Sequence, residues 1–156
     1  MKAGGGIFIS RTGASIIHNR ITDNVIDDMM SNVFAFLGGG IYSDAQEEED
    51  WVIIENNIID GNKVSSNLGG SVGGGIYTCN NARIINNIIS DNISQNIANG
   101  WSQAGGGQID GALAWGHIAV ISNNLIQLKN PPSLTVVMYV WLSRFYKFAP
   151  WANIVD

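Results

Sequence analysis

The feature that most constrains the fold of this chain is a unit that occurs four times. Each copy opens with three glycines, beginning at Gly4, Gly38, Gly73 and Gly105. Each then reaches a nine-residue block that aligns without gaps: IIHNRITDN (16–24), IENNIIDGN (54–62), IINNIISDN (84–92) and ISNNLIQLK (121–129). Self-similarity at a long period indicates a solenoid, in which each unit buries its apolar face against its neighbours.

The chemistry of the unit favours β-strands over helices. The chain has 23 isoleucines against 7 leucines, and β-branched side chains suit a pleated surface. Glycine and asparagine interrupt every run that could form a stable helix. Each unit therefore predicts one coil of short parallel strands that meet at tight corners, where asparagine tolerates a left-handed backbone.

The aligned blocks place asparagines in columns. Stacked strands lie about 4.8 Å apart, so an asparagine amide can donate to the carbonyl oxygen of the asparagine in the next coil. We expect such ladders in the fourth column, Asn19, Asn57, Asn87 and Asn124, and in the ninth, Asn24, Asn62 and Asn92, which Lys129 breaks. The column His18, Asn56, Asn86 and Asn123 predicts a second set of corner residues.

These residues carry a family resemblance. GGGIY followed by I-x-N-N-x-I-x-x-N resembles the repeat of right-handed parallel β-helix proteins of the pectate-lyase-like superfamily, and is similar to the non-enzymatic repeats of polymorphic outer-membrane proteins. The resemblance implies an all-β, right-handed parallel β-helix of about four coils, each with about three short strands. The blocks recur after 38, 30 and 37 residues, which is long for such a coil and predicts expanded corner loops.

The same resemblance implies a non-catalytic structural or adhesive module of a secreted or cell-surface protein, in contact with polysaccharide or another surface partner. The alternative is a carbohydrate-active lyase or hydrolase. Asp23 and Asp91 share a column two coils apart with Gly61 between them, but Asp and Gly at corners are ordinary turn residues. Asp60 has no acidic partner in its column, so we predict no catalytic residues.

Two long connections predict a contact face. Residues 41–53 include the acidic run 44–50, and residues 108–120 include a second tryptophan at the matching corner. The predicted ligand contacts are Trp51, Trp115, Glu49, Asp50 and His117, because exposed indoles beside acids can stack on sugar rings; the alternative is that both indoles cover apolar surface. The acidic run lacks the alternating pattern of a calcium loop, so we predict a solvated loop and no cofactor, with Ca²⁺ binding as the alternative.

Composition limits the remaining functions. A net charge of −5 with only 8 Lys and Arg argues against a nucleic-acid partner. The single cysteine, Cys79, cannot form an internal disulfide, and we expect a reduced thiol in the core rather than a nucleophile.

We expect one domain, with coils over 1–130 and a cap or tail over 131–156. Leu134 to Phe148 predicts an apolar helix, capped by Ser133, that covers the last coil; an interfacial or docking segment is the alternative, and Leu134 to Leu142 is too short to span a bilayer. Met1 is followed almost at once by the first glycine triplet, so we expect a fragment whose ends pair with further coils.

Overall fold

The chain is an all-β parallel solenoid, as its repeats predict. The computed structural model describes residues 2–28, 35–44, 50–66, 70–79, 81–96, 104–105, 109–113, 119–127, 138–142 and 153–154. All the strand pairings in these ranges are parallel and join consecutive coils.

Five parallel sheets run along the stack, and we letter them A to E in the order in which a coil passes through them. The strands of the first three coils are given below in that order. The first coil consists of β1 (Lys2–Ala3), β2 (Ile7–Ser10), β3 (Ala14–Ile17), β4 (Arg20–Thr22) and β5 (Val25–Asp28). The second consists of β6 (Ala35–Leu37), β7 (Ile41–Asp44), β8 (Val52–Glu55), β9 (Ile58–Asp60) and β10 (Lys63–Ser66).

The later coils follow the same order. The third consists of β11 (Gly70–Val72), β12 (Ile76–Thr78), β13 (Ala82–Ile85), β14 (Ile88–Ser90) and β15 (Ile93–Asn96). The fourth contributes β16 (Ala104–Gly105), β17 (Ile109–Leu113), β18 (Ala119–Ser122) and β19 (Leu125–Gln127), and the last strands are β20 (Met138–Leu142) and β21 (Asn153–Ile154).

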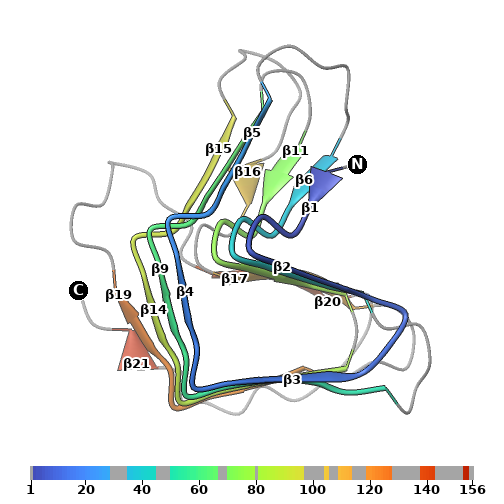
Figure 1. Cartoon of the computed structure of the whole chain (residues 1–156), viewed down its shortest axis with the longest axis vertical. Helices are drawn as coiled ribbons and strands as arrows, with labels where there is room; N and C mark the ends of the chain where they lie inside the picture. Colours follow the sequence, from blue (N-terminus) through green and yellow to red (C-terminus); the bar gives the residue numbers. More distant parts are fainter. Residues whose placement is uncertain are drawn as a thin grey trace.

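The cross-section has two lobes joined by a neck (Figure 1). Sheets B, C and D enclose the larger lobe, and sheets E and A form the smaller one. The expectation of three strands per coil is therefore wrong, because coils two and three each have five. The long repeat period arises from this second lobe, which each coil must trace before it returns to sheet B.

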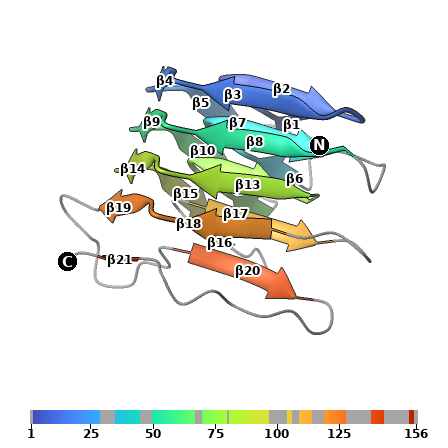
Figure 2. The ribbon, with the colours of Figure 1, turned by 90° about the horizontal axis from the view of Figure 1, so that it is seen from below.

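The coils stack in chain order and in register (Figure 2). Ile16 pairs with Ile54, Ile54 with Ile84, and Ile84 with Ile121, so one repeat is one coil. The larger lobe is filled mainly by isoleucines, and Ile54, Ile59, Ile84 and Ile89 are fully buried. A smaller cluster of Ile26, Phe36 and Val64 fills the second lobe, so the strand at residues 35–37 faces a core of its own.

The glycine triplets form the neck between sheets A and B. Gly38 and Gly73 open their triplets with φ of 63° and 62°, a left-handed backbone that favours glycine. The third glycine of a triplet is needed for a different reason, because a side chain there would collide with an asparagine. A Cβ on Gly6 would lie 2.7 Å from Asn24 Nδ2, and one on Gly40 would lie 3.0 Å from Asn62 Nδ2. The triplets and the second asparagine column therefore pack directly against each other.

Both predicted asparagine ladders are present, at the two ends of sheet D. In the first, the main-chain N–H and Nδ2 of Asn57 both donate to Asn87 Oδ1, at 2.9 and 3.0 Å, and Asn87 donates to Asn124 in the same way. In the second, Asn24 donates to Asn62 and Asn62 to Asn92. These bonds satisfy amides that would otherwise be costly to bury.

The residue before each ladder asparagine turns the corner. His18, Asn56, Asn86 and Asn123 have φ between 54° and 58°, which confirms the predicted corner column. Asp23, Gly61 and Asp91 do the same before the second ladder, with φ of 57°, 65° and 49°. Asn, Asp and Gly occupy these positions because their left-handed conformation costs least.

The predicted C-terminal helix is wrong within the described residues. Residues 138–142 form β20, which pairs parallel with β17, and residues 153–154 form β21, which pairs with β19. These strands extend sheets B and D past residue 130. The run VVMYVWL is rich in β-branched and aromatic residues, and an adjacent open strand edge favours pairing over the local helical pattern.

Candidate functional site

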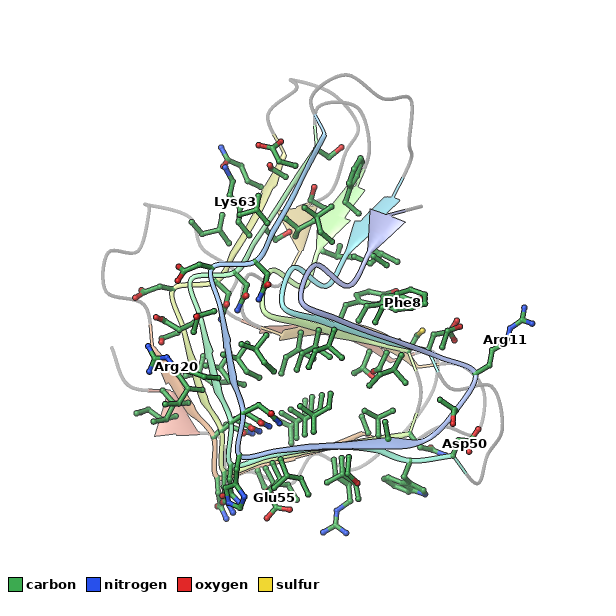
Figure 3. The ribbon with its side chains drawn as sticks, viewed as in Figure 1. Phe8, Arg11, Arg20, Asp50, Glu55 and Lys63 are labelled. Carbon is green, nitrogen blue, oxygen red and sulfur yellow. The ribbon has the colours of Figure 1, made fainter. Side chains whose placement is uncertain are left out.

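The predicted contact face lies where the chain passes from sheet B to sheet C. Asp50 and Trp51 immediately precede β8, and both are half-buried. Arg11 follows β2 at the same end of the coil and is exposed; Figure 3 shows Arg11 and Asp50 at this end of the lobe. The structure therefore brings one tryptophan, one acid and one exposed cation to a single turn region.

Backbone hydrogen bonds hold this turn in register with the rest of the stack. Ala14 N donates to Trp51 O at 3.1 Å, and Val52 N donates to Asn81 O at 2.9 Å. Gly13, Trp51 and Asn81 therefore occupy equivalent positions in consecutive coils. The residue above Trp51 is a glycine, which has no side chain to cover the indole.

Three predicted contact residues, Glu49, Trp115 and His117, lie outside the described residues. The topology bears on one part of the prediction. The connection from β7 to β8 and the connection from β17 to β18 both join sheet B to sheet C, so the two long loops do leave from the same corner.

Sequence reasoning missed an aromatic column on the outer face of sheet B. Phe8, Tyr42 and Tyr77 stack with nearly parallel rings, with centroids 5.0 Å apart for the first pair and 5.7 Å for the second. Phe8, labelled in Figure 3, lies on the side of sheet B away from the larger core. The signal was available, because an aromatic residue follows the first isoleucine after each of the first three glycine triplets.

Cys79 and Asp44 lie beside this column. Cys79 Sγ is 3.6 Å from Asp44 Oδ1 and 3.5 Å from the carbonyl oxygen of Ser43. Burial, and after it the charge of Asp44, raises the pKa of the Cys79 thiol to about 12. Burial likewise raises the pKa of the Tyr42 hydroxyl well above its ordinary value, with Cys79 and Asp44 adding to the effect.

These neighbours keep the thiol protonated, so Cys79 has none of the thiolate character that a nucleophile needs. The expectation that Cys79 packs in the core is wrong in its placement. The thiol is half-buried next to Asp44, and it does not belong to the isoleucine cluster.

The three aspartates that could suggest catalysis lie at corners of the backbone or in a hydrogen bond between coils. Asp23 and Asp91 are corner residues with a left-handed backbone, separated by Gly61 of the intervening coil. Asp60 accepts a hydrogen bond from Ser90 Oγ at 2.5 Å. In the described ranges, no three His, Cys, Asp or Glu side chains gather as metal ligands would.

None of the residues described here builds a helix of the length and apolarity needed to cross a bilayer. Comparison with known proteins assigns no family, because no protein-family model, curated protein or solved structure matches this chain.

Proposed function

We propose that the chain is a non-catalytic structural and adhesive module, which presents side loops from a rigid solenoid to polysaccharide or to another surface partner. The observation that carries this proposal is the pair of asparagine ladders. Each ladder bond joins neighbouring coils through a side chain and a main-chain N–H at once, so a coil cannot shift without losing several buried bonds.

The surface of such a stack suits a long, repetitive ligand. Side chains that point outward recur at the strand spacing of about 4.8 Å, so a polymer lying along the stack meets equivalent positions at each coil. The proposed contact point is the corner between sheets B and C, with Arg11 in the first coil and Asp50 and Trp51 in the second. It combines an indole with groups that can donate and accept hydrogen bonds, as sugar hydroxyls require.

A secreted or cell-surface location belongs to the same proposal. It is supported by the repeat pattern of the sequence, which resembles that of surface β-helix proteins. A module that meets polysaccharide outside the cell would use this combination of rigidity and side loops.

A glycan array tests the function. The wild-type chain is compared with Trp51→Ala, Trp115→Ala and the double variant, with Ser15→Ala as the control because Ser15 is exposed on the outer face of sheet C. We expect glycan binding that the tryptophan substitutions lower and the control does not. Binding that is equal in all variants would refute the contact face, and cleavage of a bound glycan would favour the lyase or hydrolase alternative.

A further inference from the structure

Among the described strands, the first coil has an unpaired edge with a defined hydrogen-bonding pattern. Strands β1 to β5 each end their sheet on this side, so they expose alternate backbone N–H and C=O groups. The core is also open here. The inward isoleucines Ile9, Ile16, Ile21 and Ile26 are 5–9% exposed, whereas Ile54, Ile59, Ile84 and Ile89 of the inner coils are at 0%.

The ladders show what chemistry is missing at this edge. Every ladder bond points the same way, from the N–H and Nδ2 of one asparagine to Oδ1 of the asparagine in the following coil. Asn57, Asn87, Asn62 and Asn92 therefore accept from the coil before them. Within the described part of the chain, no donor reaches the Oδ1 atoms of Asn19 and Asn24.

A second set of bonds is altered at the same place. Asn57 Nδ2 donates to Ile16 O of the preceding coil, and Asn87 Nδ2 donates to Ile54 O, both at 2.8 Å. Asn19 Nδ2 instead donates to Ile17 O of its own strand at 2.9 Å, and its bond to Asn57 Oδ1 is long, at 3.4 Å. Asn19 thus lacks the preceding carbonyl that its ladder partners use.

We propose that this edge binds a parallel β-coil of a partner protein, with asparagines five residues apart at the two corners of that coil. The occupant's two asparagines donate to Asn19 Oδ1 and Asn24 Oδ1. The carbonyl three residues before its first asparagine accepts from Asn19 Nδ2, as Ile16 O accepts from Asn57. Its inward apolar side chains cover Ile16 and Ile21. This proposal does not depend on any glycan contact.

The fourth coil of a second copy is a poorer match. Its block has Asn124 at the first corner but Lys129 at the second, and β20 and β21 already pair with the strand edges of sheets B and D. The third coil carries both asparagines, so its sequence is a suitable probe for the free edge.

The probe is a labelled peptide with the sequence of residues 82–96, ARIINNIISDNISQN, added to the intact chain. We expect saturable binding by fluorescence anisotropy, with new hydrogen-exchange protection confined to 14–28. Alanine at both Asn19 and Asn24 should weaken binding at least tenfold, because each lost acceptor removes bonds worth several-fold in affinity. Alanine at Ser15, which points away from the core, should not change it.

Register is tested by a disulfide in a Cys79→Ser background. Ser15 and Arg83 both pair with Ile53, so they share one column. A cysteine at Ser15 should cross-link to a peptide with cysteine in place of Arg83, and not to one with cysteine in place of Ile85. The proposal is overturned by absent binding, by equal binding to the Asn19→Ala/Asn24→Ala chain, or by equal cross-linking of both peptides. Self-association of the chain that blocks the peptide would also overturn it, by assigning the edge to a second copy.

Discussion

Removing one asparagine from the middle of a ladder should cost far more stability than removing the one at its end. In Asn87→Ala, Asn57 loses the shared acceptor of its N–H and Nδ2, and Ile54 O and Asn124 Oδ1 lose the donor they share. Asn87 is 1% exposed, so water cannot replace these partners. At about 1 kcal/mol for each net bond, the expected loss is about 3–5 kcal/mol.

The matched substitution is Asn19→Ala. Asn19 is exposed, and among the described residues its side chain bonds only to Ile17 O and, at 3.4 Å, to Asn57 Oδ1, so we expect a loss of about 1 kcal/mol or less. Urea denaturation followed by circular dichroism measures both, with stability compared at equal m-values. Equal losses for the two variants would refute the ladder as a source of stability.

Other substitutions test the corners, the thiol and the aromatic column. Gly73→Asn should lower the thermal midpoint markedly, because its Cβ would lie 2.5 Å from the backbone oxygen of Ile76. Gly61 has a similar left-handed φ, but its Cβ would meet only the side-chain Oδ1 of Asp23, at 2.7 Å, which can move away, so Gly61→Asn should be tolerated far better. Equal shifts would contradict the account of the triplets. The raised pKa of Cys79 predicts slow alkylation at pH 8 that Asp44→Asn accelerates, and an unchanged rate would exclude the effect of the carboxylate. Folding raises the pKa of Cys79 from 9.0 to about 12, so the protonated thiol favours the folded state. This stabilisation is complete below pH 9 and is lost as the pH rises towards 12, which a measurement of the free energy of unfolding against pH would detect. Tyr42→Ala should cost about 3 kcal/mol in urea because Tyr42 is 3% exposed within the stack, and Tyr42→Phe should cost about 1 kcal/mol; similar costs would show that the ring contributes little.

The repeat predicted the fold because its information is carried by columns. Ile54 specifies an inward side chain and Asn56 specifies a corner, and each coil repeats the same signal. The number of strands in a coil was not predictable in the same way. The second lobe is closed around Phe36 and Val64, which no repeated motif marks.

The C-terminal segment shows the limit of local patterns. An apolar helix was predicted from Leu134 to Phe148, but residues 138–142 instead form a strand that pairs with the edge of β17. The candidate site was predicted in part. Trp51 and Asp50 do lie together at the corner between sheets B and C. The aromatic column was not predicted, because Phe8, Tyr42 and Tyr77 lie outside the aligned nine-residue blocks.

The central claim, that the repeats stack in register as consecutive coils, is tested most directly by spin labels on one outer column. Labels replace Ser15 and Arg83, two coils apart, in a Cys79→Ser background. Twice the strand spacing places the two backbones about 10 Å apart, which predicts strong dipolar broadening in the continuous-wave spectrum. A doubly labelled chain whose spectrum equals the sum of the two singly labelled spectra would contradict the stack.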